Sequence, residues 1–218
     1  MKTAVVIGAT GLIGSELVQK LMNSSEYNKI IAIVRRPKEW PSQKVEVINI
    51  PFEQLEQQQF SDGADYFCAL GTTIKQVGSQ AEFRKVDYEY VLSFAKVAKK
   101  CSANSFHLVS ALGASAKSAN FYSRTKGQIE NAVSNLEIKK VRIYRPSLLI
   151  GKREKLGQPS RLGEEIFTVV YNNAKFLFSG FMKKYEPITA EKVATAMFNK
   201  AVANTSLVKE IISNQDMH

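Results

Sequence analysis

Three side chains in the middle of the sequence could carry out proton transfer together. Tyr122 and Lys126 stand four positions apart in FYSRTK, and Ser110 lies upstream at the end of the apolar run SFHLVS. A tyrosine hydroxyl, with an ordinary pKa of about 10, exchanges protons poorly at neutral pH unless a nearby cation favours its ionised form. Lys126 would supply that cation, Tyr122 would donate a proton to a carbonyl oxygen, and Ser110 would hold the same oxygen.

The helix expected to carry these groups has a clear apolar stripe. In FYSRTKGQIENAVSNL the stripe consists of Ile129, Val133 and Leu136, and its backward extension at 100° per residue reaches Tyr122 and Lys126. Lysine is rarely buried without a partner, because removing an ammonium group from water is costly. We therefore expect an inward-facing lysine with a function. The alternative is an ordinary helix entry, since Y-x-x-x-K is frequent by chance.

A glycine-rich turn follows the first apolar run of the sequence. GATGLIG, residues 8–14, stands between TAVVI and the helical pattern SELVQKLM. This spacing permits a tight turn, a close approach of backbone to a pyrophosphate and close packing of helix against strand. The N–H groups at the start of the helix would bind the anion. We expect a dinucleotide site rather than a turn made only for packing, and assign to it Gly8, Thr10, Gly11, Leu12, Ile13 and Gly14.

The end of the second apolar run indicates which dinucleotide binds. An acidic residue about 20 positions after the glycine turn would accept hydrogen bonds from the ribose 2′-hydroxyl of NAD. Here the sequence reads IVRRP instead, with Arg35 and Arg36. Two guanidinium groups suit a 2′-phosphate, so NADP(H) is predicted over NAD(H). The alternative is a solvated basic turn.

The order of elements predicts an α/β fold. Six runs rich in β-branched residues have helical segments between them, and their continuous apolar character indicates strands buried on both faces. We expect a doubly wound, Rossmann-like parallel sheet in one domain spanning 1–218, with residues 146–218 forming a small elaboration on the substrate side. The segment 166–181 would be a pocket wall or, alternatively, a membrane or partner contact. The runs are 3–8, 29–34, 45–50, 64–70, 105–110 and 140–145, and the longest helix is 79–101.

Composition excludes a disordered or fibrous protein. Apolar residues make up 44% and charged residues 23% of the 218, as in ordinary globular proteins. The net charge of +10 is dispersed along the chain, so nucleic-acid binding is not expected. Without a long apolar run or a secretory signal, we expect no membrane span and a cytoplasmic location. Cys68 and Cys101 are expected in the core, and no metal-ligand spacing surrounds them.

Together these motifs resemble the atypical short-chain dehydrogenase/reductase superfamily, in the branch typified by the human Tat-interacting tumour suppressor oxidoreductase and a yeast mitochondrial outer-membrane relative. The resemblance implies an NADP(H)-binding Rossmann-like domain, with Ser110, Tyr122 and Lys126 at the catalytic positions. It also implies that Leu70, Gly71 and Thr72 lie near the adenosine, and Arg145, Pro146 and Ser147 near the nicotinamide. The matching segments are 8–14, 69–73, 83–91, 110–114, 121–130 and 144–154.

The chain departs from this pattern at three positions. Ala111 stands where relatives often have a second serine, Pro51 where they have an acidic residue near the adenine, and Asp87 where many have a helix asparagine. The function expected first is an NADPH-dependent oxidoreductase acting on a small, partly apolar carbonyl or alcohol. The alternative is a dinucleotide-binding regulatory protein with weak or no redox turnover that acts through a protein partner. A homo-oligomer is compatible with either.

Overall fold

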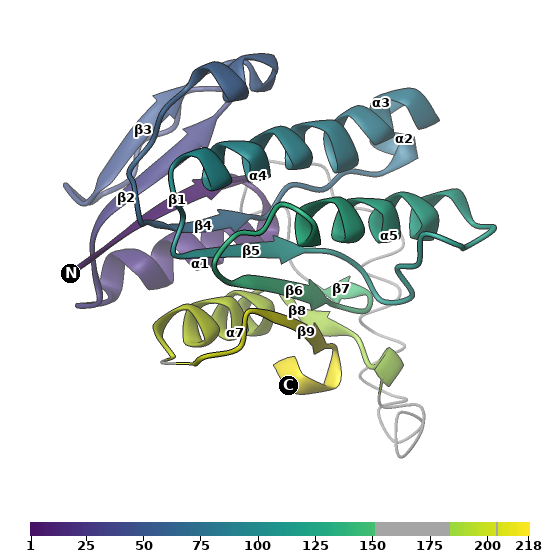
Figure 1. Cartoon of the computed structure of the whole chain (residues 1–218). Helices are drawn as coiled ribbons and strands as arrows, with labels where there is room; N and C mark the ends of the chain where they lie inside the picture. Colours follow the sequence, from purple (N-terminus) through teal and green to yellow (C-terminus); the bar gives the residue numbers. More distant parts are fainter. Residues whose placement is uncertain (151–183, 204) are drawn as a thin grey trace.

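The central feature is a parallel sheet of seven strands in the order β3-β2-β1-β4-β5-β6-β9 (Figure 1). The computed structural model describes residues 1–150, 184–203 and 205–218. The expectation of a doubly wound parallel sheet is therefore confirmed. The strands are β1 Lys2–Ile7, β2 Tyr27–Val34, β3 Val45–Asn49, β4 Asp65–Cys68, β5 Ser105–Val109, β6 Val141–Arg145 and β9 Lys209–Ser213.

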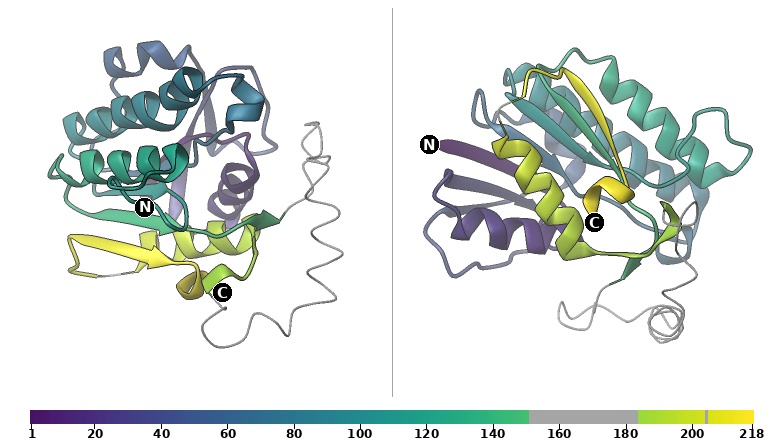
Figure 2. Two further views of the ribbon diagram at one scale, coloured as in Figure 1. Left: turned by 90° about the vertical axis from the view of Figure 1, so that its right-hand side faces the viewer. Right: turned by 90° about the horizontal axis from the view of Figure 1, so that it is seen from below.

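Helices cover both faces of this sheet. Helices α4 (Tyr90–Lys100) and α5 (Phe121–Ser134) pack on one face, and α1 (Leu12–Asn23) and α7 (Ala190–Val202) on the other (Figure 1). The view from below in Figure 2 shows α1 and α7 side by side. Successive side chains of β1 enter the two layers alternately, because strand side chains alternate between faces. Covering both faces explains why the strands read as continuous apolar runs.

The strand order reverses between β1 and β4. From β1 the chain passes outward through β2 and β3, and it then returns to β4 on the other side of β1. Ligands of open α/β sheets bind outside the carboxyl ends of the strands at such a switch point. The loops that follow β1 and β4 are therefore the first place to look for a site.

The long helix expected at 79–101 is divided. It consists of α3 (Gln80–Arg84), a π-helical turn (Lys85–Glu89) and α4, after the short α2 (Ile74–Val77). Phe83 and Phe94 of this segment are fully buried. A π-helical turn carries one extra residue per turn and is frequent at functional sites. Here the turn includes the buried Asp87.

Two predictions about strands were incomplete. Residues of β3 were expected to be buried on both faces, but β3 is half exposed because it forms one edge of the sheet. Strand β9, at the other edge, was not predicted, since KEIIS is short and half polar. Two further strands, β7 (Leu149–Ile150) and β8 (Ile188–Thr189), pair with each other outside the main sheet. The segment expected as a pocket wall, 166–181, lies outside the described residues.

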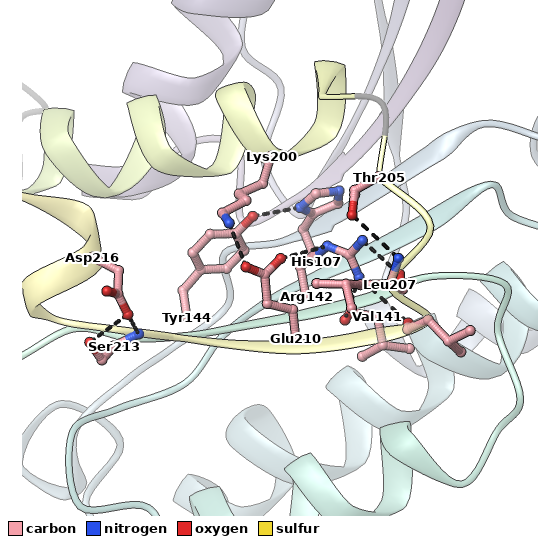
Figure 3. A network of polar contacts seen from close by, with 11 residues as sticks. His107, Val141, Arg142, Tyr144, Lys200, Thr205, Leu207, Glu210, Ser213 and Asp216 are labelled. Atoms are coloured by element: carbon pink, nitrogen blue, oxygen red, sulfur yellow. Dashed lines mark hydrogen bonds and ion pairs between the residues drawn. The ribbon is translucent and has the colours of Figure 1, made fainter.

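Polar contacts hold β9 in place (Figure 3). The Arg142 side chain on β6 is 1% exposed and lies 3.2 Å from Glu210 of β9, and Lys200 of α7 also pairs with Glu210. Arg142 further donates to the carbonyl oxygens of Leu207 and Val208, at 2.8 and 3.5 Å. The C-terminal strand is thus fixed by a buried cation at the amino end of the sheet.

Other buried groups have local structural roles. The Cys68 and Cys101 thiols are buried and free, as expected. The His107 ring lies within hydrogen-bond distance of Ser105 (2.9 Å) and Tyr144 (2.8 Å).

In the parts of the chain that the structure describes, every helix is too short or too polar to cross a bilayer.

Candidate active site

The glycine turn brings β1, α1 and β4 together. Gly8 has a φ of +78°, and a Cβ atom there would lie 2.6 Å from the carbonyl carbon of Ala69, which follows β4. A Cβ atom on Gly14 would lie 2.1 Å from the Gly8 carbonyl oxygen. Only glycine therefore allows the first turn of α1 to rest on the end of β1. This is the packing expected for the turn.

The N-terminus of α1 is open to an anion. Its cap is Gly11, and no side chain among the described residues accepts a hydrogen bond from the first turn. The first turn contains no acidic residue, so the N–H groups of Leu12 and Ile13 and the positive end of the helix dipole face the switch point uncompensated. A pyrophosphate fits this donor set, and Thr10 adjoins it in the turn.

Arg35 and Arg36 follow β2 directly and are exposed. The Arg35 guanidinium lies 5.3 Å from the centre of the Phe52 ring, which begins the 3-10 turn Phe52–Gln57 after Pro51. Within the described residues neither arginine forms an ion pair. Both cations are therefore available at the strand end where a dinucleotide places its adenosine ribose.

Lys126 is buried, as its place on the helical stripe predicted. Its side chain is 4% exposed, and its Nζ lies 2.6 Å from Oδ1 of Asp87, which is 1% exposed. Burial alone lowers the pKa of Lys126, but the charges of Asp87 and Tyr122 outweigh it, so the pKa is above its ordinary value. Oδ2 of Asp87 accepts a hydrogen bond of 2.9 Å from the Thr72 N–H. Asp87 thus connects the lysine to the loop 70–72 after β4.

Tyr122 lies one turn before Lys126 at the open end of the site. Its side chain is 38% exposed, and its ring packs against Phe83 with 5.6 Å between ring centres. The phenol is therefore held on its apolar side and is accessible to a substrate. Sequence reasoning had placed the tyrosine on the same inward stripe as the lysine. The structure shows it at the margin of that stripe, since it lies in the first turn of α5.

Ser110 follows β5 and is 5% exposed, but it already has a partner. Its hydroxyl donates to Oε1 of Glu130 on α5 at 2.5 Å. Glu130 also accepts from Nε and Nη2 of Arg145 at 3.0 and 2.5 Å. The hydrogen bonding of Arg145 to Glu130 and the negative charge of Glu130 raise the pKa of Arg145. Sequence reasoning missed Glu130, although its place one turn after Lys126 was the available signal.

Close backbone packing fixes the position of α5. The Asn120 side chain caps the helix by accepting from the Ser123 N–H at 3.1 Å. A Cβ atom on Gly127 would lie 2.1 Å from the backbone nitrogen of Ala116, so the loop before the helix crosses directly over it. Tyr122, Lys126 and Glu130 are thereby set at successive turns along the carboxyl ends of the strands.

The loop after β6 also lies at the carboxyl ends of the strands. Pro146 accepts a hydrogen bond of 2.8 Å from the Leu112 N–H, and the Ser147 N–H donates to Oδ1 of Asn214 at 2.9 Å. The predicted residues thus lie together at the carboxyl ends of the strands. The loops after β1, β2 and β4 carry the glycine turn, the two arginines and Leu70, Gly71 and Thr72; those after β5 and β6 carry Ser110, Arg145, Pro146 and Ser147.

Comparison with known proteins places the chain in a family. Residues 8–141 match a family model described as NAD(P)H-binding. The chain belongs to this NAD(P)H-binding family. The matched range begins at the first glycine of the turn and ends at the start of β6, so it contains the glycine turn, Ser110, Tyr122 and Lys126.

Curated relatives of this NAD(P)H-binding protein agree with the resemblance. The chain is 33% identical to mitochondrial protein FMP52 of Debaryomyces hansenii, over 88% of this chain and 84% of the relative. It is 29% identical to protein HTATIP2 of Rattus norvegicus, over 98% of this chain and 87% of the relative. The atypical short-chain dehydrogenase/reductase branch is therefore confirmed.

These relatives also correct one expectation. A cytoplasmic location was expected because the sequence showed no secretory signal. FMP52 proteins of Debaryomyces hansenii, Candida albicans and Eremothecium gossypii are named as mitochondrial. The cytoplasmic expectation is contradicted by these names, which point to mitochondria.

Solved structures confirm the Rossmann-like fold. The chain resembles MoeE5 in complex with UDP-glucose and NAD, with a TM-score of 0.70 and 14% identity, over 96% of this chain and 75% of that chain. It resembles equally a UDP-N-acetylglucosamine 4-epimerase from Methanobrevibacter ruminantium, with a TM-score of 0.70 and 15% identity, over 97% and 75% of the two chains.

Proposed function

We propose that this chain is an NADPH-dependent oxidoreductase that moves hydride to or from a small, partly apolar carbonyl or alcohol. The observation that supports it best is the buried Lys126, one turn from the accessible Tyr122. A lysine is rarely removed from water unless it is paired, and its partner Asp87 connects this one to the loop after β4. This one lies at the sheet edge where the glycine turn and the open N-terminus of α1 would hold a dinucleotide.

The residues at the carboxyl ends of the strands would have separate roles in cofactor binding and proton transfer. The glycine turn and the N–H groups of Leu12 and Ile13 would bind the pyrophosphate, and Lys126 would anchor the nicotinamide ribose. The bound cofactor would supply or accept the hydride. Tyr122 would give its proton to the carbonyl oxygen while the carbonyl carbon receives hydride, and would take the proton back in the reverse direction. The loop 145–147 would border the nicotinamide.

NADP(H) is proposed over NAD(H) because of the end of β2. Arg35 and Arg36 are exposed, and within the described residues they have no acidic partner. A 2′-phosphate would form charge-assisted hydrogen bonds with both. We expect NADPH to bind at least tenfold more tightly than NADH, and Arg35→Ala with Arg36→Ala to remove the difference. Tighter binding of NADH by the unchanged protein would contradict the assignment.

Turnover tests the oxidoreductase itself. NADPH consumption is measured against a panel of aldehydes, ketones and quinones, for the unchanged protein, Tyr122→Phe and Lys126→Ala. Loss of the proton donor lowers kcat by roughly 10² or more. Equal turnover of every substrate by the unchanged protein and Tyr122→Phe would show that the catalytic assignment is wrong. NADPH affinity by fluorescence titration serves as the control, since Tyr122→Phe retains the fold and the glycine turn.

One observation supports a second candidate, a dinucleotide-binding regulator with little redox turnover. Lys126 and Ser110 both have internal carboxylate partners, Asp87 and Glu130, in the structure described. NADPH would then change a partner interaction instead of reducing a substrate. Tight NADPH binding without turnover on any member of the panel would favour this candidate.

A further inference from the structure

The segment that precedes α4 lies beside α5 and contacts it at two positions (Figure 1). The Phe83 ring of α3 packs against the Tyr122 ring, with 5.6 Å between ring centres. One turn later, Oδ1 of Asp87 lies 2.6 Å from Nζ of Lys126. The two contacting residues stand four positions apart in each segment, so the contacts follow one another along both. One segment therefore contacts both the candidate proton donor and the lysine beside it.

The contact with Phe83 restricts where the Tyr122 hydroxyl can lie. This hydroxyl is on the axis of its ring, so rotation of the ring about χ2 leaves it in place and only a change of χ1 moves it. In helices, aromatic side chains adopt χ1 near 180° or −60°. The Phe83 ring is fully buried and lies against one side of the Tyr122 ring, whose other surroundings are partly solvent. A buried ring that cannot move aside thus selects between the two rotamers.

Helix α3, which carries Phe83, is itself fixed to α5. The Phe83 ring packs edge-on against Phe121, the first residue of α5, with 5.7 Å between ring centres. The next residue, Arg84, donates from Nη1 to Oε1 of Gln128 at 2.8 Å. These contacts precede and follow Tyr122 along α5, so α3 cannot shift away from the tyrosine without breaking them.

We propose that Phe83 is a positioning residue that holds the Tyr122 phenol in one χ1 rotamer, one turn from Lys126. The inference rests on the proposed function, because it concerns the side chain assigned to proton transfer. Phe83 is 0% exposed, so it touches no substrate and acts only through Tyr122. Its contribution matters because a small misplacement of a reacting group lowers the rate strongly.

The rotamer populations of Tyr122 test this role without a substrate. They are obtained by NMR from the three-bond couplings of the ring Cγ to the backbone nitrogen and carbonyl carbon, in isotope-labelled protein. We expect one rotamer in the unchanged protein. In Phe83→Leu the ring contact is lost, and the two rotamers allowed in a helix should become about equally populated. A single Tyr122 rotamer in Phe83→Leu, or two in the unchanged protein, would overturn the proposal.

Phe94→Leu is the matched control. Phe94 is also fully buried, but its ring packs against Tyr66 and Phe106, with 5.5 and 5.7 Å between ring centres. The substitution removes the same atoms from the core, so it should lower the thermal midpoint about as much as Phe83→Leu. Tyr122 should nevertheless keep one rotamer. Mixed rotamers in this control would mean that general loosening of the core is responsible, and Phe83 would have no special role.

A double-mutant cycle connects the contact to catalysis. On the carbonyl of the panel that is turned over fastest, Phe83→Leu should lower kcat about fivefold, with KM and NADPH affinity within about twofold of the unchanged protein. Phe94→Leu should leave kcat within about twofold. In Tyr122→Phe, adding Phe83→Leu should have no further effect on kcat, because the group that it positions is gone.

The same factor lost from kcat in both backgrounds would contradict a role through Tyr122. Absence of turnover by the unchanged protein would count against the proposed function. The rotamer populations would still decide whether Phe83 holds Tyr122.

Phe83→Met takes the place of Phe83→Leu if the leucine variant does not fold. Methionine fills irregular gaps in a core with a flexible chain, but it presents no flat ring to the tyrosine. We expect the same mixture of Tyr122 rotamers and the same loss of kcat, with a smaller decrease in thermal midpoint. A methionine variant with one Tyr122 rotamer and an unchanged kcat would refute the assignment.

Discussion

Two buried carboxylates lie next to the candidate catalytic groups. Asp87 contacts Lys126, and Glu130 contacts Ser110 and Arg145. The free energy needed to remove two charges from water is about as large as their attraction once buried, so a buried ion pair adds little net stability. Their value here is geometric, since each carboxylate fixes a side chain that would touch cofactor or substrate. Removing either partner would leave an uncompensated charge.

A buried histidine makes stability depend on pH. Burial lowers the pKa of His107 to about 3, against about 6.5 when unfolded. The unfolded chain therefore binds a proton below pH 6.5 that the folded chain excludes, and stability is lost as pH falls from there toward 3. We expect the free energy of unfolding to drop by about 2 kcal/mol between pH 7 and pH 5, measured by urea denaturation. His107→Gln should remove most of this drop; an unchanged drop would contradict the assignment.

At the scale of elements, α5 is the part that assembles the site. Three functional candidates, Tyr122, Lys126 and Glu130, lie at successive turns of it, so its position determines theirs together. The Asn120 cap and the contact of Gly127 with the loop at Ala116 set that position. The π-helical turn before α4 brings Asp87 to the same place from the neighbouring helix.

Gly127→Ala tests this contact. Alanine favours a helix by about 1 kcal/mol over glycine, but its Cβ atom would lie 2.1 Å from backbone that cannot move aside cheaply. Overpacking of this kind costs roughly 1–3 kcal/mol, so the variant should be less stable in urea denaturation and should bind NADPH more weakly. Asn131→Ala, at an exposed position of the same helix, should stay within about 0.5 kcal/mol of the unchanged protein. A more stable Gly127→Ala would refute the contact.

At the scale of the whole molecule, the sheet joins segments far apart in the sequence. The central β1 contacts β2 and β4, and the last strand, β9, returns to pair with β6. Arg142 secures this return through Glu210 and the carbonyl oxygens before β9. The C-terminal strand thereby supports β6, whose loop 145–147 borders the site.

Arg142→Met tests the role of this cation. Lys200 remains as a partner of Glu210, but the carbonyl oxygens of Leu207 and Val208 lose their donor. Leaving a part-buried acceptor without its donor costs roughly 1–3 kcal/mol, so we expect a loss of that order in unfolding free energy. Hydrogen exchange should show β9 amides losing protection before those of β1. Lys29→Met is the control, because Lys29 and Glu46 pair at 2.8 Å across the other edge but are about half exposed. It should cost no more than about 1 kcal/mol. Equal protection of β9 in both variants would contradict this role.

Much of the fold could be read from local patterns. Apolar runs and their spacing predicted six of the seven strands of the main sheet, and the glycine turn predicted the packing of α1 on β1. The period of α5 predicted that Lys126 is buried. These properties depend on residues close together in the sequence, so no knowledge of the tertiary structure was needed. Strand β9 was missed because its pairing, and not its own apolar pattern, makes it a strand.

The partners of the site residues were decided by the tertiary structure. Asp87 meets Lys126 across two helices, and Glu130 meets Ser110 and Arg145 across a helix and the ends of two strands. Such pairs depend on strand order and on the rotation of each helix, which local periodicity does not specify. The sequence by itself determined that a serine, a tyrosine and a lysine would lie along one edge of a parallel sheet. Only the folded chain decided that the proton of Ser110 goes to Glu130, because the two residues are brought within hydrogen-bond distance by the packing of α5 against β5.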